Sequence, residues 1–337
     1  MPRRLIALVL AVVAAASLAA CGERKESAGP AKRQSLRLML DYLPNADHAG
    51  IYAAQGTGAF NRVGLDVKLQ TPSDPSAPLK LLAAGRVDLA ISYEPELLLA
   101  RDQGQKLVAV GALVQKPLTS IVSIGRNAIS DPRQLAGKTV GTAGIPYQSA
   151  YLKAILARAK VDPTTVKEVN VGFSLVPAML SGKVDATLGS FWNYEAIQLA
   201  QQRKRPKVIR MENAGVPTYN ELVIVAREKD LAENGGARIR RFMRALGQGV
   251  KALRKNPESG IAPLLRANPD LDRRLQEASV KATLPVFFPA DSSKPVGYMN
   301  ASEWAAYGAW MARNRLLRNP PDPGRALTNE FLPGEGV

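Results

Sequence analysis

Short apolar segments alternate with amphipathic segments along the first part of the chain. Residues 36–40, 65–70 and 89–92 are rich in Leu, Ile and Val over the length of a strand, whereas 49–60 and 79–84 place apolar side chains at helical spacing. The resulting order is strand, helix, strand, helix, strand. Such alternation predicts a mostly parallel sheet with helices on both faces.

The same order of elements recurs further along the chain. The segments LKLLAAGRVDLAIS (79–92) and VPAMLSGKVDATLG (176–189) share a Gly-[Arg/Lys]-Val-Asp core, in which Asp88 corresponds to Asp185. Because both aspartates stand at the start of a predicted strand, we interpret them as structural. The repeat predicts two similar α/β lobes.

Two further strands are placed where they can connect the lobes. Ile121–Ile124 lies between the repeats and Leu222–Ala226 follows the second one. We therefore expect two crossings, near 120–126 and 220–226, that act as hinges beside a cleft. Helices after the second crossing return to the first lobe, and lobe 1 is then 36–123 and 226–337, with lobe 2 at 124–225.

The C-terminal part is predicted to be helical. One long amphipathic helix collects its apolar residues on one side, and these are Ile239, Phe242, Met243, Leu246 and Val250. A later helix carries Trp304, Tyr307 and Trp310, which we interpret as core residues.

The N-terminus has the layout of a secretory signal. Two arginines precede an apolar run ending near Leu18, which is shorter than the ~20 residues of a membrane-spanning helix. The following Leu-Ala-Ala-Cys sequence resembles the bacterial lipobox. We therefore expect 1–21 to be a lipoprotein signal peptide that ends at a lipidated Cys21, and 22–35 to be a flexible tether.

The composition excludes several kinds of chemistry. Cys21 is the only cysteine and His48 the only histidine, so the mature chain has no thiol and lacks the histidine pair of a catalytic zinc site. Its sequence contains no glycine-rich nucleotide-binding motif. We expect no catalytic residues, no metal and no cofactor.

The net charge of +16 raises the question of a nucleic acid partner. Lys and Arg are spread along the chain, and the densest cluster, at 237–255, is interrupted by apolar residues at helical spacing. A solvated helix face on a protein held near anionic lipid explains this pattern better. We expect no binding to nucleic acid.

Ligands of open α/β sheets bind beyond the carboxyl ends of the strands. This rule selects the turns at 41–48, 73–75, 92–95, 142–148, 173–174 and 190–195. Aromatic residues make up 6% of the chain, yet these turns contain Tyr42, Tyr93, Tyr147, Phe173, Phe191, Trp192 and Tyr194. They also contain Asp41, Glu94 and Glu195, and they contain no Lys or Arg.

Aromatic faces and carboxylates without cations suit a flat, neutral heterocycle that carries an amine. A stacked ring contributes about 1–3 kcal/mol, and a carboxylate that accepts its exocyclic N–H contributes roughly 1.5–3 kcal/mol. Phosphate, sulfonate, nitrate and carboxylate ligands usually bring Arg or Lys to a site. His48 opens a helix, and it fits a ligand contact and a bond to neighbouring backbone equally well.

The segments LDYLPNADHAGIYAAQGTGAFNRVGLDV, PSDP and GRVDLAISYEPELLLAR carry a resemblance to a known family. They closely resemble the thiamine-pyrimidine-precursor binding proteins, extracytoplasmic components of ABC importers for formylaminopyrimidine or hydroxymethylpyrimidine. The superfamily also includes taurine- and nitrate-type binding proteins and the fungal pyrimidine synthase. The resemblance is close over 36–101 and looser up to Glu221. It implies a type II periplasmic-binding-protein fold of two α/β lobes with two hinge crossings.

The resemblance also implies roles for single residues. It places Asp41, Asn45 and His48 in the wall of the first lobe. It gives Tyr93 as a stacking face and Glu195 as the carboxylate that pairs with the aminopyrimidine edge. The family usually has Trp where this chain has Tyr42, which leaves the exact ligand open. The expected substrate-binding set is Asp41, Tyr42, Asn45, His48, Tyr93, Glu94, Tyr147, Trp192, Asn193 and Glu195.

We therefore expect a lipid-anchored, monomeric binding protein on the periplasmic face of the cell membrane that delivers an aminopyrimidine thiamine precursor to an ABC permease. The alternatives are binding of another aromatic vitamin, such as a riboflavin-like one, or of a sulfonate- or nitrate-type ligand. The rival from another class is a pyrimidine synthase. This chain lacks the synthase's cysteine cluster and has Glu96 at the place of its reactive histidine.

Overall fold

The computed structural model describes residues 33–126, 128–319 and 322–334. The predicted signal peptide, the lipidation site Cys21 and most of the predicted tether lie outside these residues. Gln34–Val337 forms one compact unit, which contains all of the strands and helices described below. The predicted tether extends too far, because the first strand begins at Gln34 and buries Leu36 and Leu38 on one face.

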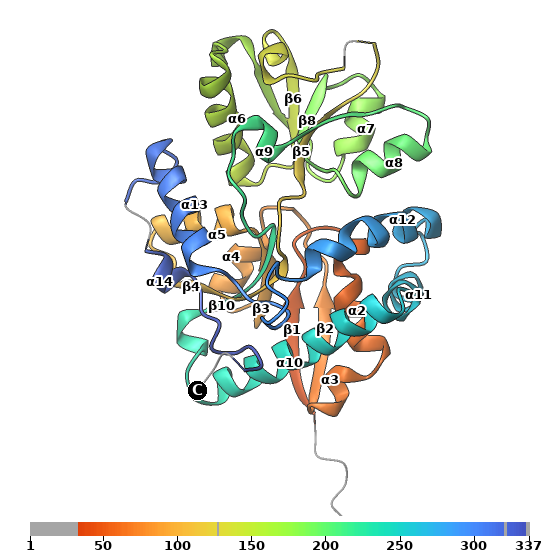
Figure 1. Cartoon of the computed structure of the whole chain (residues 1–337), viewed down its shortest axis with the longest axis vertical. Helices are drawn as coiled ribbons and strands as arrows, with labels where there is room; N and C mark the ends of the chain where they lie inside the picture. The colour runs from red at the N-terminus through yellow and green to blue at the C-terminus, as the bar shows by residue number, and fades with distance from the viewer. Residues whose placement is uncertain (1–32, 127, 320–321, 335–337) are drawn as a thin grey trace, which may run out of the picture. The chain divides into compact units, whose positions relative to one another are not determined.

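Two five-stranded sheets form the centres of two lobes (Figure 1). The first sheet contains β1 (Gln34–Met39), β2 (Leu65–Gln70), β3 (Leu89–Ser92), β4 (Leu107–Val114) and β10 (Leu222–Arg227), and the second contains β5 (Thr119–Ser123), β6 (Thr139–Thr142), β7 (Lys167–Asn170), β8 (Ala186–Phe191) and β9 (Lys207–Arg210). The strand orders are β2-β1-β3-β10-β4 and β7-β6-β8-β5-β9. In each sheet one strand, β10 or β5, runs antiparallel to both of its neighbours.

Helices flank both sheets (Figure 1). Those of the first lobe are η1 (Ala46–His48), α2 (Ala49–Gly56), α3 (Ala59–Arg62), α4 (Pro78–Ala83), α5 (Glu94–Asp102), η4 (Glu228–Asp230), α10 (Glu233–Lys255), α11 (Glu258–Ala267), α12 (Arg273–Thr283), η5 (Leu284–Phe287), α13 (Ala301–Arg313) and α14 (Pro323–Ala326). Those of the second are η2 (Pro132–Leu135), α6 (Pro146–Ala159), η3 (Pro163–Thr165), α7 (Leu175–Leu180), α8 (Glu195–Gln201) and α9 (Met211–Ala214). Among the described residues, every helix is too short or too polar to span a membrane. The two-lobed α/β prediction is confirmed.

The predicted core residues of the C-terminal helices are buried. All five apolar residues of the α10 face lie in the core, as do Trp304 and Tyr307, while Trp310 is half-buried against it. Helix α10 crosses α2 so closely that a Cβ at Gly249 would lie 2.4 Å from the Gly50 carbonyl oxygen. This crossing therefore requires glycine at position 249.

The sequence repeat corresponds to equivalent bonds in the two lobes. Asp88 Oδ2 accepts a hydrogen bond from the Arg37 backbone N–H at 2.8 Å, and Asp185 Oδ2 accepts one from the Thr139 backbone N–H at the same distance. Asp88 thus ties the loop before β3 to β1, and Asp185 ties the loop before β8 to β6. Their interpretation as structural residues is confirmed.

Strand pairing places both crossings earlier than the sequence predicted. Strand β5 pairs only with β8 and β9 of the second sheet, and β10 pairs with β3 and β4 of the first. The crossings are therefore 115–118 and 215–221, and the predicted lobe boundaries at 123/124 and 225/226 lie too late. The apolar pattern found both strands, but it carries no information about which sheet a crossing strand joins.

One buried carboxylate connects the two crossings. Glu221 Oε2 accepts the backbone N–H groups of Leu118 and Thr119 at 2.5 and 2.9 Å, and Glu221 Oε1 accepts the Thr119 hydroxyl at 2.7 Å. The Tyr219 hydroxyl donates to Oε2 at 3.0 Å. Burial raises the pKa of Glu221 to about 7, against the opposing effect of these donors. The carboxylate therefore satisfies donors that have no access to water.

Replacing Glu221 with Ala should destabilise the protein strongly. The substitution removes the acceptor of the Leu118, Thr119 and Tyr219 donors, and leaving buried donors unpaired costs about 1–3 kcal/mol each. We expect Glu221→Ala to lower the free energy of unfolding by roughly 2–4 kcal/mol in urea denaturation. The matched control is Glu212→Ala at an exposed position of α9, expected to change it by less than about 0.5 kcal/mol. Equal effects of the two substitutions would contradict this account of the crossings.

Candidate functional site

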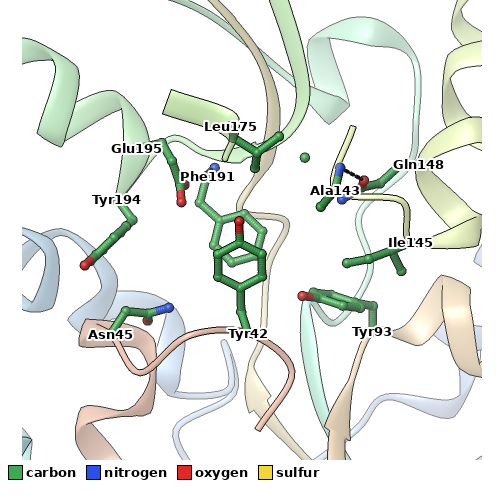
Figure 2. A pocket seen from close by; sticks show the side chains of 11 residues that line it. Tyr42, Asn45, Tyr93, Ala143, Ile145, Gln148, Leu175, Phe191, Tyr194 and Glu195 are labelled. Atoms are coloured by element: carbon green, nitrogen blue, oxygen red, sulfur yellow. Dashed lines mark hydrogen bonds between the residues drawn. The ribbon is translucent and has the colours of Figure 1, made fainter. Parts of the chain in front are cut away.

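A pocket lies between the lobes, at the carboxyl ends of the strands (Figure 2). Its walls come from the turns after β1 and β3 in the first lobe. In the second lobe they come from β8, from the starts of α6, α7 and α8, and from the turns after β6 and β8. The empty space, counted with its open mouth, is about 330 Å³. The lining residues are Tyr42, Asn45, Tyr93, Ala143, Ile145, Gln148, Leu175, Gly189, Phe191, Tyr194 and Glu195. The pocket thus lies where the strand-end rule predicts a ligand site.

Aromatic rings form much of the pocket wall. Tyr42 belongs to the first lobe, and its ring packs in a T-shaped arrangement with Phe173 of the second lobe. The two ring centroids are 4.8 Å apart. The Tyr42 hydroxyl also donates to the Gly172 carbonyl at 3.5 Å. Tyr93 packs at 5.0 Å between ring centroids against Tyr147, which belongs to α6 of the second lobe. Rings from both lobes therefore meet around the pocket.

Among the described residues that line the pocket, Glu195 supplies the one carboxylate. Its Oε2 accepts the Phe191 backbone N–H at 2.7 Å, which holds the side chain at the start of α8. Burial raises the pKa of Glu195 to about 7, and the nearby Asp47 charge acts in the same direction. Figure 2 shows the carboxylate beside Tyr194, on one side of Tyr42. This group can accept a hydrogen bond from a ligand N–H.

Gln148 and Gly189 form another part of the wall. The Gln148 Oε1 atom accepts the Ala143 backbone N–H at 2.8 Å, which orients the amide. A Cβ at Gly189 would lie 2.4 Å from Gln148 Nε2, and Gly189 has a φ of 122°. Position 189 therefore requires glycine for two reasons. A side chain would displace the Gln148 amide, and the positive φ is strained for any other residue. The amide gives the pocket a polar position that carries no net charge.

Asp41 and His48 lie behind Tyr93 and outside the pocket lining. The Tyr93 hydroxyl donates to Asp41 Oδ2, and His48 Nε2 bonds Asp41 Oδ1, each at 2.8 Å. The Asn45 backbone N–H donates to His48 Nδ1 at 3.2 Å, so the imidazole proton is on Nε2 and points at Asp41. His48 therefore supports the wall residue Tyr93 through Asp41 and does not face the pocket.

Asn193 forms a buried contact between the lobes. Its Nδ2 group donates to Asp47 Oδ1 and to Thr283 Oγ1, both at 2.6 Å, and Asp47 and Thr283 belong to the first lobe. Burial raises the pKa of Asp47 to about 6. Nearby, Gln276 Nε2 of α12 donates to the Tyr194 hydroxyl at 3.0 Å. These bonds hold the turn after β8 against the first lobe at one end of the pocket.

The remaining predicted site residues do not line the pocket. Glu94 Oε2 accepts the Asn220 backbone N–H at 2.7 Å, beside the second crossing. Tyr147 is fully buried and its hydroxyl bonds that of Thr119 at 3.0 Å. Trp192 donates through Nε1 to the Pro117 carbonyl at 2.9 Å, and the Arg210 guanidinium lies 4.1 Å from its ring centroid. These three side chains bond residues of the two crossings or of the adjoining strand β5.

Of the ten predicted substrate-binding residues, Tyr42, Asn45, Tyr93 and Glu195 line the pocket. Ligand contact by these four stays a prediction. Seven other lining residues are absent from the predicted substrate-binding set, although most of them fall in the predicted turns: Ala143, Ile145, Gln148, Leu175, Gly189, Phe191 and Tyr194. The glycine inside an apolar strand pattern was a usable signal for Gly189, since such a glycine often marks a close approach.

The chemical character of the pocket is aromatic and weakly acidic. In the part of the chain that the structure describes, no Lys or Arg is among the residues that line it. Within 33–126, 128–319 and 322–334, no group of three or more His, Cys, Asp or Glu side chains could hold a metal ion. The lining can stack a flat ring and accept its N–H groups.

Comparisons with known proteins agree with this fold. The family described as NMT1/THI5 like matches residues 45–260. A formylaminopyrimidine-binding protein of Halalkalibacterium halodurans is 31% identical over 321 residues, which cover 94% of this chain and 95% of that protein. A 4-amino-5-hydroxymethyl-2-methylpyrimidine phosphate synthase of Legionella pneumophila is 22% identical over 304 residues, 89% of this chain and 93% of the synthase.

A solved structure shares the fold at low sequence identity. The alkanesulfonate-binding protein SsuA from Xanthomonas axonopodis pv. citri, bound to MOPS, superposes with a TM-score of 0.68 at 16% identity, covering 88% of this chain and 99% of that protein. This likeness establishes the two-lobed fold of periplasmic binding proteins. The family match and the relative at 31% identity show that the chain belongs to the NMT1/THI5-like family.

Proposed function

We propose that this chain is the extracytoplasmic substrate-binding component of an ABC importer, and that it binds an aminopyrimidine thiamine precursor in the pocket between its lobes. The observation that carries the proposal is the combination of aromatic walls with a single carboxylate and no cation in the described lining. The similarity to a formylaminopyrimidine-binding protein supports the same ligand class. Its similarity to binding proteins supports a role in binding rather than catalysis.

The proposed ligand matches the pocket in shape and in hydrogen bonding. Formylaminopyrimidine and hydroxymethylpyrimidine are flat rings that can stack on Tyr42, Tyr93 or Phe191. Each carries an exocyclic amine whose N–H can donate to a Glu195 oxygen, and a charge-assisted bond of this kind contributes roughly 1.5–3 kcal/mol. The Gln148 amide offers a neutral partner elsewhere in the lining. The ligand therefore needs no charge of its own.

The alternatives are less well supported. A sulfonate- or nitrate-type ligand needs Arg or Lys, or a cluster of aligned donors, and the described lining holds neither cation. Relatives of lower sequence identity are named as pyrimidine phosphate synthases. At the position proposed for the reactive histidine, Glu96 is buried and accepts the Ser92 hydroxyl at 2.5 Å, outside the pocket lining. Another aromatic vitamin remains an outcome of the ligand test.

The proposal includes export and lipid anchoring at Cys21. The apolar run before Cys21 and the small residues at its end support this, although these residues lie outside the described structure. The lipid would keep the protein next to its permease on the outer side of the cell membrane. We propose that it acts there as a monomer.

An aminopyrimidine should stabilise the protein, because a ligand that binds only the folded state raises the melting temperature. We expect formylaminopyrimidine or hydroxymethylpyrimidine to raise it, and Glu195→Gln to weaken binding by roughly tenfold. Gln keeps an acceptor for the Phe191 N–H but loses the charge. Glu212→Gln is the control and should bind normally. A shift with taurine or riboflavin and none with either pyrimidine would refute the ligand assignment.

The stability of the ligand-free protein should depend on the protonation of Glu195. Burial raises its folded-state pKa to about 7, above the ordinary glutamate value of 4.5, so the folded state binds more protons than the unfolded state between these values. Stability is therefore lost as the pH rises through this window, and Glu195→Gln removes that loss. Urea unfolding should show the variant gaining roughly 1–3 kcal/mol on wild type between pH 5 and pH 8. A difference that is independent of pH would contradict the burial of this carboxyl.

Loss of Cys21 should abolish anchoring. With Cys21→Ala, we expect the protein to leave the membrane fraction of cells that express the full chain, because no thiol remains for lipid. Replacing Ser27 with Ala, also ahead of the described fold, is the control and should leave fractionation unchanged. Continued association of Cys21→Ala with membranes after a high-salt wash would count against the lipid anchor.

A further inference from the structure

The base of the first lobe is the edge of its sheet opposite the pocket. The parallel strands β1, β2 and β3 begin at this edge, and the antiparallel β10 ends there. The chain also enters the fold at this edge, since β1 begins at Gln34. Any tether from Cys21 is therefore attached on the side away from the pocket.

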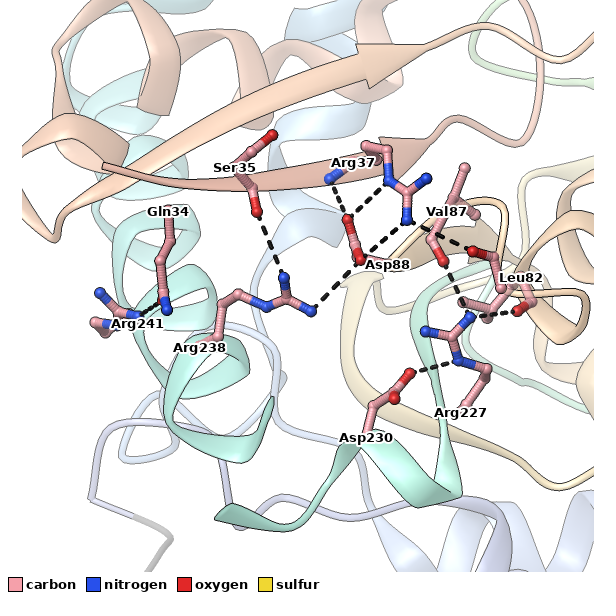
Figure 3. A network of polar contacts seen from close by, with 11 residues as sticks. Gln34, Ser35, Arg37, Leu82, Val87, Asp88, Arg227, Asp230, Arg238 and Arg241 are labelled. Atoms are coloured by element: carbon pink, nitrogen blue, oxygen red, sulfur yellow. Dashed lines mark hydrogen bonds and ion pairs between the residues drawn. The ribbon is translucent and has the colours of Figure 1, made fainter. Parts of the chain in front are cut away.

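Arginines gather at this base (Figure 3). Arg238 and Arg241 of α10 reach the first residues of β1, where Arg238 donates to the Ser35 carbonyl at 3.4 Å and Arg241 bonds the Gln34 side chain. Four others come from β1, α3, the turn before β3 and the end of β10. The set, here called the basic face, is Arg37, Arg62, Arg86, Arg227, Arg238 and Arg241.

Carboxylates balance only part of this charge. Asp88 is shared by two guanidinium groups, with Arg37 at 3.1 Å and Arg238 at 3.5 Å. Asp230 pairs with Arg227 at 2.5 Å. Among the described residues, the other three arginines of the basic face form no ion pair within 4.0 Å. Arg62 and Arg241 donate to neutral oxygens instead. The basic face therefore keeps a net positive charge.

We infer that the basic face binds the anionic surface of the membrane from which the protein is tethered. The inference rests on the proposed lipid anchor. Residues 22–33 can extend over at most about 45 Å, so a lipidated Cys21 keeps the base close to the bilayer. Near an anionic surface each Lys or Arg contributes about 1 kcal/mol. The covalent tether and the charge therefore act at the same edge of the fold.

This contact sets the orientation of the protein. With the base on the lipid, the pocket at the opposite ends of β1 and β3 faces away from the membrane, toward dissolved ligand. The attraction is screened by salt and distributed over a few side chains, so it is weak and reversible. The membrane-bound state is thus one of ligand capture, and delivery to a permease requires the base to leave the lipid.

Vesicle co-sedimentation tests the inference without the anchor. The chain from Gly22 to Val337 contains every described strand and helix and has no cysteine. The probes are vesicles of phosphatidylcholine alone and of phosphatidylcholine with phosphatidylglycerol. The variant is Arg62→Gln with Arg86→Gln, two exposed positions of the basic face. The matched control is Lys153→Gln with Lys183→Gln, which removes the same charge from exposed positions of the second lobe, Lys183 being the repeat equivalent of Arg86.

We expect binding to the anionic vesicles only, weakened roughly tenfold or more by the basic-face pair, much less by the control pair, and lost in high salt. Equal losses in the two pairs would overturn the inference, because they would mean attraction to net charge and not to this face. Binding to neutral vesicles, or no binding to either, would also overturn it. Both variants should retain the melting-temperature shift with an aminopyrimidine, so failure of the membrane contact is distinguishable from failure of the proposed function.

Discussion

The arrangement of the molecule depends on a single buried carboxylate, Glu221, which takes hydrogen bonds from both connections between the lobes. Because Leu118 and Thr119 of one crossing donate to it, and Tyr219 of the other does too, the crossings form one unit. Each crossing strand then enters the opposite sheet as its antiparallel member. The turns at the carboxyl edges of both sheets supply residues that line one pocket.

Around the pocket, side chains that do not touch the cavity position those that do. Asp41 accepts from Tyr93 and from His48, so the ring of Tyr93 is held by a buried chain of hydrogen bonds. At the other end, Asn193 fastens the turn that carries Glu195 to Asp47 of the first lobe. Such indirect support explains why some polar residues next to lining residues in the sequence are buried outside the pocket.

The sequence was sufficient for the architecture, because the repeated alternation of strands and helices fixes two α/β lobes and the strand-end rule locates the pocket between them. It was insufficient for the details of the site. Turns 41–48 and 190–195 both supply the lining, yet Asp41 and Asn193 within them turn into the protein and Tyr42 and Glu195 into the pocket. That choice depends on partners from distant segments, as it does for Glu94, which bonds Asn220 at the crossing. Local pattern carries no information about such partners.

The central claim is that aromatic faces and one carboxylate, without a cation, select a neutral aminopyrimidine. A crystal structure of the chain from Gly22 grown with hydroxymethylpyrimidine tests it most directly. The account predicts the ring stacked on an aromatic side chain of the pocket, with its exocyclic amine within hydrogen-bond distance of a Glu195 oxygen. A pyrimidine bound outside the pocket, or bound in it with the amine directed away from Glu195, would contradict the account.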